Sequence, residues 1–353
     1  MSESALPKIA QVMAGARYGG AETAFCDTVI ALHEAGFPQI VAMRDHPEQV
    51  ARLKKAGLPV HTYSFGGPFD VVTPWKLQKL FKDEKPQIVQ TWMGRACQKL
   101  PTVKGEKPYK VVARLGGYYK MKYFKAADFF IGNTPDIRDY VIREGVSPQN
   151  AVFIPNFAPE DPLPETPLTR EEMDTDPAMK VGLCLGRYHE AKALDIAIRS
   201  VAPLPDVTLW LAGEGPDRKK LEELAKELGI AHRIKFLGWR EDRGALFQAA
   251  DFCLFPSRFE PFGNVAVQAW ANKRPLIVSD ADGPRQYVQD HEDALMVPIE
   301  DVGATTNAIR KLLSDPKLAD KLVTNGYRRF KGEFSKNVTI AAYRTFYERV
   351  LLS

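Results

Sequence analysis

Residues 255–272 have the sequence FPSRFEPFGNVAVQAWAN. The stretch begins at the end of an apolar strand (251–255), turns at a Pro-Ser pair, and continues as a helix from Asn264. A strand–turn–helix unit points the free backbone N–H groups of its first helical turn above the sheet, where they suit an anion. Glu260 lies on the turn, and Gln268 lies one helical turn beyond Asn264 on the same side. The alternative is an ordinary strand–helix junction with a surface glutamate.

The size and composition of the chain indicate a globular protein with two domains. Its 353 residues are too many for one ordinary core, and 45% apolar with 26% charged residues is a globular balance. No apolar run approaches the ~18 residues of a membrane span. The N-terminus lacks the basic and apolar regions of a signal peptide, so we expect a cytoplasmic protein.

Cysteine and histidine spacing gives no indication of a metal site. The four cysteines share no CxxC spacing and lie mostly in apolar segments, which favours buried, reduced thiols. The six histidines are scattered. Asp280-Ala281-Asp282 resembles a metal-binding DxD, but it precedes Gly-Pro at the opening of a helix and is better explained as a turn and helix cap. We expect no metal and no cofactor.

The net charge of +4 conceals an asymmetry between the two halves. Residues 1–155 carry 21 Lys and Arg against 14 Asp and Glu, and the remainder is mildly acidic. Between Lys99 and Lys125 there are eight basic residues and one acidic residue. This distribution suggests an anionic partner for the N-terminal half.

Strands alternate with helices along the whole chain, which predicts parallel, doubly wound sheets with ligands beyond the carboxyl ends of the strands. Residues 155–177 interrupt the alternation with six prolines and seven acidic residues, as a linker does. We therefore expect a Rossmann-like domain over 1–160, a linker over 161–178, and a second Rossmann-like domain over 179–334. A C-terminal helix over 335–353 is expected to pack back toward the first domain. Two such domains would face each other across a cleft.

Basic residues follow the first strand of the second domain. Gly186 and Arg187 come directly after that strand, and Lys192 precedes the next helix. Both cations are therefore expected at the same sheet edge as Glu260, where they suit a diphosphate. A solvated loop is the alternative for such a short motif. The chain has no GxGxxG and no GxxxxGK[ST], which counts against NAD and P-loop nucleotides.

Taken in order, these residues resemble the family 4 retaining glycosyltransferases of the two-Rossmann GT-B architecture. The matching motifs run through most of the chain. They are Gly19-Gly20-Ala21-Glu22, Asn133-Thr134, Ile154-Pro155-Asn156, Leu185-Gly186-Arg187 with Lys192, Ala212-Gly213-Glu214-Gly215-Pro216, Phe236-Leu237-Gly238, Pro256-Ser257 with Glu260-Pro261-Phe262-Gly263, and Ser279 to Pro284.

The resemblance implies metal-independent transfer of a sugar from a nucleotide-diphosphate donor. It implies that Arg187 and Lys192 neutralise the diphosphate and that Glu260 binds the donor sugar near the reacting centre. The remaining donor-binding residues that it implies are Gly19, Gly20, Gly186, Gly238, Phe262, Gly263, Asn264, Val265 and Gln268. The leaving phosphate is thought to help deprotonate the acceptor hydroxyl in this family, so a protein base is not required.

Three positions depart from the family pattern. Gln268 replaces a second acid that usually binds the ribose hydroxyls, which an amide oxygen can still accept. No histidine follows the strand at 110–115, where the chain has Arg114-Leu-Gly-Gly. Ala193 replaces the glycine that commonly follows the diphosphate lysine.

A run of basic and aromatic residues over 114–125 suits anionic lipid headgroups or a phosphorylated glycan. It also suits single-stranded nucleic acid, but nothing else in the chain supports that partner. A solvated helix with its aromatic residues in the core is the alternative. The acceptor or membrane patch predicted here consists of Arg95, Arg114, Tyr118, Tyr119, Lys120, Lys122 and Lys125.

The first interpretation is a glycosyltransferase that acts on a cell-envelope acceptor, a lipopolysaccharide core or another lipid-linked glycan, from the cytoplasm or the inner face of the membrane. A second is a non-catalytic or altered-donor subunit that binds a sugar nucleotide or glycan, which the amide of Gln268 would favour. A GT-B epimerase or phosphorylase is the third, and it would need acid and base groups that the sequence does not show.

Overall fold

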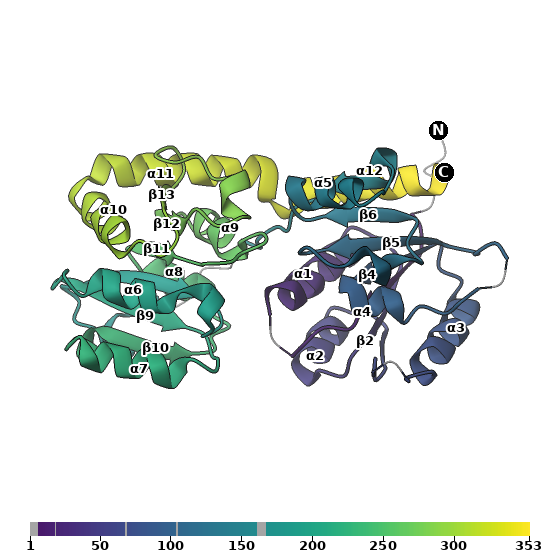
Figure 1. The fold of residues 1–353 in the computed structure, drawn as a ribbon, viewed down its shortest axis with the longest axis horizontal. Coiled ribbons are helices and arrows are strands. Elements are labelled where there is room, and N and C mark those ends of the chain that lie inside the picture. The colour runs from purple at the N-terminus through teal and green to yellow at the C-terminus, as the bar shows by residue number, and fades with distance from the viewer. Residues whose placement is uncertain (1–5, 18, 68, 104, 161–166) are drawn as a thin grey trace. The chain divides into compact units, whose positions relative to one another are not determined.

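The chain forms two compact units, each built on one parallel sheet (Figure 1). The computed structural model describes residues 6–17, 19–67, 69–103, 105–160 and 167–353. Unit 1 comprises Met1–Phe157 together with Lys336–Ser353, and unit 2 comprises Ala158–Ser335. Both units have the Rossmann-like architecture that the alternation of strands and helices predicted.

The sheet of unit 1 has the strand order β3-β2-β1-β4-β5-β6-β7, and all neighbours are parallel. Its order reverses between β1 and β4, which marks the usual ligand crevice at the carboxyl edge of such a sheet. The strands are β1 Ile9–Met13, β2 Gln39–Met43, β3 Val60–Thr62, β4 Ile88–Trp92, β5 Lys110–Leu115, β6 Phe129–Gly132 and β7 Ala151–Phe153.

Helices cover both faces of this sheet because its central strands are apolar on both sides. In β1, Ile9 and Met13 face α1, α2 and α12, whereas Ala10 and Val12 face α3, α4 and α5. The helices are α1 Gly20–Glu34, α2 Pro47–Lys55, α3 Val72–Glu84, α4 Met93–Gln98, α5 Pro135–Arg143 and α12 Lys336–Leu352.

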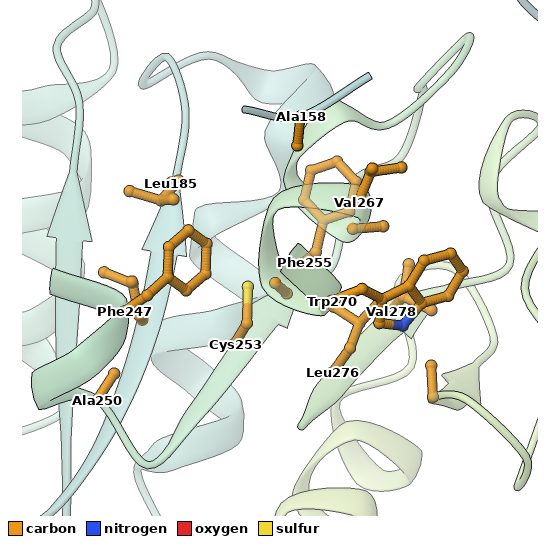
Figure 2. Close-up of a cluster of buried hydrophobic side chains, with 14 of the residues drawn as sticks. Ala158, Leu185, Phe247, Ala250, Cys253, Phe255, Val267, Trp270, Leu276 and Val278 are labelled. Atoms are coloured by element: carbon orange, nitrogen blue, oxygen red, sulfur yellow. The ribbon is translucent and has the colours of Figure 1, made fainter. Parts of the chain in front are cut away.

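Unit 2 repeats the plan with a sheet of order β10-β9-β8-β11-β12-β13. Helices α8 and α9 cover one face, where Trp270, Phe255 and Val267 share a buried cluster (Figure 2), while α6, α7 and α10 cover the other. The elements are β8 Lys180–Leu185, α6 Leu194–Val201, β9 Val207–Ala212, α7 Arg218–Glu227, β10 Ile234–Gly238, α8 Arg243–Ala249, β11 Phe252–Phe255, α9 Asn264–Ala271, β12 Leu276–Ser279, β13 Leu295–Val297, α10 Val302–Ser314 and α11 Pro316–Arg329.

A buried arginine joins the C-terminal helix to the sheet of unit 1. Arg114 on β5 is only 2% exposed, and its Nε donates to the hydroxyl of Tyr343 on α12 at 2.6 Å. One of its terminal nitrogens donates to Oδ1 of Asn156 at 2.7 Å, and the guanidinium lies 4.8 Å from the ring centroid of Trp92. Arg114 therefore does not belong to an exposed acceptor or membrane patch, which corrects the sequence-based expectation.

Glutamine side chains extend this polar network across the sheet. Trp92 donates its indole N–H to Oε1 of Gln11 at 2.9 Å, and Gln11 donates to Gln39 at 3.0 Å. The hydroxyl of Tyr347 donates to Oε1 of Gln90 at 2.8 Å. Most of these buried polar groups thus find partners on α12 or on each other, whereas the Nε2 of Gln90 has no hydrogen-bond partner within the described part of the chain.

The structure differs from the sequence-based expectation at three places. The solvated helix considered for the run 114–125 is only a 3-10 turn at Met121–Phe124, and α4 was not predicted. Residues 167–178 of the expected linker belong to unit 2, where Arg170 donates to the carbonyls of Ala249 and Met179. Residues 161–166 of that linker lie outside the described residues. The sequence predicted a linker over these residues because they show little apolar periodicity. In the structure, polar side chains hold residues 167–178 to unit 2.

No helix in the described part of the chain is both long and apolar enough to cross a membrane.

Substitution of Tyr343 by phenylalanine tests the buried network. The change removes the oxygen that accepts from Arg114 and leaves a charged donor buried without that partner, so we expect a loss of about 2 kcal/mol in the free energy of unfolding. Tyr347→Phe is the matched control, because its hydroxyl bonds only a neutral amide. Urea denaturation measures both variants, and equal losses would contradict a special role for the Arg114 contact.

Candidate functional site

The candidate site in unit 2 lies at the carboxyl edge of its sheet, above β8 and β11. Lys192 follows β8 and Glu260 follows β11, and the two side chains form an ion pair. The carboxylate of Glu260 is 13% exposed and the ammonium side chain of Lys192 is 27% exposed, so both are sheltered but reachable. The ammonium nitrogen also lies 5.7 Å from the ring centroid of Phe255. The structure therefore brings together two residues that the sequence predicted to share one site.

Hydrogen bonds from Gly283 and Tyr287 to backbone carbonyls hold the turn between Glu260 and α9. The carbonyl of Glu260 accepts from the amide of Gly283 at 2.8 Å. The hydroxyl of Tyr287 donates to the carbonyl of Phe262 at 2.7 Å, and burial raises the pKa of this tyrosine well above its usual value. Gly263, with φ of 97°, allows the left-handed step that starts α9. This support fixes the position of the first turn of α9 relative to Glu260.

Arg258 is a residue that the sequence analysis did not single out, although it lies two residues before Glu260. Its two terminal nitrogens donate to the two carboxylate oxygens of Asp195 at 2.9 and 2.8 Å. Burial would raise the pKa of Asp195, but the hydrogen bonds and charge of Arg258 lower it. Arg258 also donates to the carbonyl of Glu190 at 2.8 Å, and its amide donates to the carbonyl of Ala191 at 2.9 Å. The arginine therefore joins the Lys192 turn to the Glu260 turn.

Ala193 occupies a position whose backbone conformation favours glycine, the residue that the family pattern has there. It has φ of 51° and ψ of 38° and precedes α6, so the chain needs a left-handed residue directly after Lys192. Glycine adopts this conformation freely, whereas an L-residue pays about 1–2 kcal/mol for it. The alanine methyl is fully buried, and this packing accompanies the strained conformation.

The other predicted donor-binding residues of unit 2 are spread along the same sheet edge. Gly238 ends β10, three strands away from β11, and Gly186 and Arg187 follow β8. Arg187 is exposed and forms no ion pair with any residue that the structure describes. Gln268 lies in the second turn of α9 and is 8% exposed. Asn264, Val265 and Phe262 occupy the first turn of α9 and the residues before it.

In unit 1, Gly19 and Gly20 begin α1 beside the carboxylate of Glu22. Glu22 is only 7% exposed and accepts from the amide of Ala16 at 2.8 Å. A side chain at Gly19 would meet Oε2 of Glu22 at 2.2 Å, so the Glu22 carboxylate would have to move to admit it. Burial, and then the charge of Glu22, raise the pKa of Tyr119.

The predicted basic and aromatic patch is only partly exposed. Lys120, Lys122 and Lys125 are exposed, and Tyr118 is 39% exposed, but its hydroxyl donates to Asp136. The other aromatic residues of this segment pack against the core of unit 1: Tyr119, Tyr123 and Phe124.

Arg95 of the predicted patch lies exposed on α4 and has a basic neighbour that the sequence analysis missed. Burial, and then the charge of Arg95, lower the pKa of Arg44, which follows β2. Arg44 directly follows a strand in the sequence, and this position could have identified it as a residue at the sheet edge.

Metal ligands are not gathered in the described residues, where no group of three or more His, Cys, Asp or Glu side chains could hold an ion. Asp280 of the DxD sequence pairs with Arg285.

Replacement of Arg258 by alanine tests whether this residue positions the Lys192 turn. We expect faster amide hydrogen exchange in residues 189–195 and a loss of about 1–3 kcal/mol in stability, because Asp195 loses its bidentate partner. Arg285→Ala removes an arginine–carboxylate pair that is exposed and serves as the control. Unchanged exchange in 189–195 would show that the turn holds its conformation without Arg258.

Comparisons with known proteins agree with the fold and show the family. The family model for glycosyl transferases group 1 matches residues 167–329. Lipopolysaccharide core biosynthesis glycosyltransferase LpsE of Rhizobium meliloti (strain 1021) is 32% identical over 327 residues, which cover 92% of this chain and 94% of the relative. Lipopolysaccharide core biosynthesis glycosyltransferase LpsD from the same organism is 30% identical, and the match covers 94% of this chain and 95% of the relative.

Among solved structures, Anabaena Alr3699/HepE in complex with UDP and glucose superimposes with a TM-score of 0.83. The match covers 97% of this chain and 99% of that chain at 18% identity, so it supports the fold alone. Together with the full-length relatives, these findings show that the chain is a glycosyltransferase of the GT-B fold and belongs to the group 1 glycosyl transferases.

Proposed function

We propose that this glycosyltransferase moves a sugar from a nucleotide-diphosphate donor to a lipid-linked glycan of the cell envelope, of the lipopolysaccharide core class. The transfer retains the anomeric configuration and uses no metal. We further propose that the protein works in the cytoplasm, at the inner face of the membrane. The observation that carries the donor half of this proposal is the sheltered ion pair between Lys192 and Glu260 at the start of α9.

This pair matches the two ends of a sugar diphosphate. A phosphate can take the place of the Glu260 carboxylate on Lys192, and a sugar hydroxyl can donate to the freed carboxylate. Arg187 has no anionic partner among the described residues and can add a second cation. The first turn of α9 supplies backbone N–H groups and the positive end of a helix dipole. Negative charge that grows on the leaving phosphate is stabilised by these fixed groups.

The distance between the two ends of the predicted donor site also suits a nucleotide sugar. Gly238 at the end of β10 and Glu260 after β11 are separated by three strand spacings, or about 14 Å. A diphosphate alone is shorter than this distance, whereas a base, a ribose and a diphosphate in line can cover it. Gln268 on α9 would meet the ribose hydroxyls with its amide oxygen.

The acceptor would be bound by unit 1. The Gly19-Gly20 loop and the neighbouring Glu22 and Tyr119 lie at the carboxyl edge of its sheet, where a parallel α/β unit binds ligands. In the retaining reaction the bond between the anomeric carbon and the phosphate oxygen breaks, and a bond to the acceptor oxygen forms on the same face. The hydroxyl proton passes to the leaving phosphate, so no protein base takes part.

The names of the full-length relatives support the acceptor class. LpsE and LpsD are both lipopolysaccharide core biosynthesis glycosyltransferases, and each is aligned over more than nine-tenths of its length. The Anabaena HepE complex contains UDP and glucose, which supports a nucleotide-sugar donor.

Donor binding can be tested with a thermal-shift screen of UDP, GDP and ADP sugars, because a ligand of the folded state raises the melting temperature. For the donor found, we expect Lys192→Ala and Glu260→Gln each to lower turnover about 100-fold or more, since each removes a group that contacts the reacting sugar diphosphate. Lys226→Ala, an exposed charge on α7, is the control. A purified wild-type protein that binds a donor but transfers no sugar to delipidated or lipid-linked core would contradict the proposal.

The role of Gln268 is tested by Gln268→Glu. A carboxylate accepts stronger hydrogen bonds than an amide oxygen, so we expect the dissociation constant of the donor to fall about fivefold. Gln289→Glu adds the same charge at an exposed position and controls for long-range electrostatics. Isothermal titration measures both. Weaker donor binding in Gln268→Glu would show that the amide is suited to this donor, and unchanged binding would place residue 268 away from the ribose.

A further inference from the structure

Unit 1 displays a compact apolar surface between β3 and α3. Phe69, Val71, Val72 and Trp75 are 96%, 74%, 52% and 62% exposed, and all four fall within seven consecutive positions. Large apolar side chains that are exposed singly are ordinary, but a cluster of this kind marks a surface that another phase or molecule covers. We call these four residues the apolar wedge.

The backbone under the apolar wedge is firmly held. The carboxylate of Asp70 accepts from the amide of Gly66 at 2.7 Å, from the amide of Thr73 at 3.0 Å and from the hydroxyl of Thr73 at 2.7 Å. Hydrogen bonds from Thr73 hold the pKa of Asp70 well below its usual range. The ammonium group of Lys99 donates to the carbonyls of Gly67 and Asp70 at 2.6 and 3.0 Å. The wedge is therefore presented by a built loop, and its exposure is a property of the fold.

Cations continue the exposed side of α3 beyond the wedge. Lys76, Lys79 and Lys82 are exposed, and they follow Val72 and Trp75 at helical spacing, while Leu77 and Leu80 face the core. An apolar aromatic end followed by lysines is the composition of a segment that lies in the interface of an anionic bilayer. A protein partner that buries an apolar patch gives no reason for this row of three cations, whereas anionic headgroups do.

The position of the loop that carries the apolar wedge also fits contact with a membrane-held acceptor. It follows β3, so it is at the carboxyl edge of the sheet, the edge that binds ligands in parallel α/β units. The segment 118–125 is at the same edge, but its aromatic residues pack inward or bind Asp136, and only its lysines remain for a lipid surface. Of the two segments, the wedge with the lysines of α3 exposes far more apolar side chain, since Phe69 and Trp75 are 96% and 62% exposed against 39% for Tyr118.

We propose that the apolar wedge inserts into the interfacial layer of an anionic membrane while Lys76, Lys79 and Lys82 bind its headgroups. This inference extends the proposed function by naming the surface that brings the enzyme to a lipid-linked acceptor. Membrane binding by the wedge needs no donor, so it is measured independently of sugar transfer.

The test is sedimentation of the full chain with vesicles of phosphatidylcholine alone or mixed with phosphatidylglycerol. We expect the wild type to bind the anionic vesicles and to lose about tenfold or more in partition coefficient in the double variant Phe69→Ser/Trp75→Ser, because two large apolar side chains no longer leave water. A loss of about tenfold or more is also expected in Lys76→Gln/Lys79→Gln/Lys82→Gln, at roughly 1 kcal/mol per cation.

The matched control is Lys120→Gln/Lys122→Gln/Lys125→Gln, which removes the same charge from the other segment and is expected to keep most of the binding. Brominated lipid should quench the fluorescence of Trp75, and the quenching should disappear in Trp75→Phe. Circular dichroism checks that each variant is folded.

Failure of the wild type to bind anionic vesicles would overturn the inference, and so would a loss confined to the control triple variant. Unchanged sugar transfer to a detergent-solubilised acceptor in the wedge variant would show that the proposed function holds while the membrane contact is lost. If the wild type binds anionic vesicles but transfers no sugar, the proposed function is wrong and membrane binding by the apolar wedge is still supported.

Discussion

The buried charge of Arg114 is the constraint on which the organisation of unit 1 depends. A guanidinium cannot remain inside a protein without partners, and its partners here come from two distant parts of the chain. Ile154 and Asn156 lie just before the chain leaves unit 1, and Tyr343 lies just after it returns. One side chain therefore ties both crossing segments to the middle of the sheet. The helix at the C-terminus of the sequence belongs to the N-terminal unit through this hydrogen bond and through the apolar side chains that it buries in the core of that unit.

Unit 2 uses polar contacts in a different way, to position side chains that remain reachable. Arg258 joins the backbone after β8 to the backbone after β11 and so sets the distance between Lys192 and Glu260. Tyr287 and Gly283 hold the turn from the opposite side. Groups that are fixed before a ligand arrives lose little entropy when it binds, and fixed charges stabilise developing charge without reorganising. The rigid frame thus fixes Lys192 and Glu260 in the positions that the proposed transfer requires.

Local patterns in the sequence were enough to predict the two Rossmann-like units and the meeting of Lys192 with Glu260, because parallel strands bring their carboxyl ends to one edge whatever the loops contain. They were not enough for Arg114, which stands beside lysines and tyrosines in the sequence but faces inward from a strand. Burial of such a residue depends on α12, more than two hundred residues away. Arg258 and the wedge were missed for the same reason: hydrogen-bond partners and exposure are tertiary properties.

The two units also differ in what their sequences have in common with other glycosyltransferases. The group 1 family model matches residues 167–329, which lie entirely in unit 2, while the lipopolysaccharide core relatives are aligned over both units. In the proposed reaction unit 2 binds the nucleotide-diphosphate donor, and the motifs of the resemblance that bear on the donor lie mostly in that unit. In the same proposal unit 1 binds the acceptor, and because acceptors vary in size, charge and lipid attachment, we expect its sequence to vary more than that of unit 2. The apolar wedge lies in unit 1, outside residues 167–329 that the family model matches, and this place agrees with the proposed contact of that unit with a membrane-held acceptor.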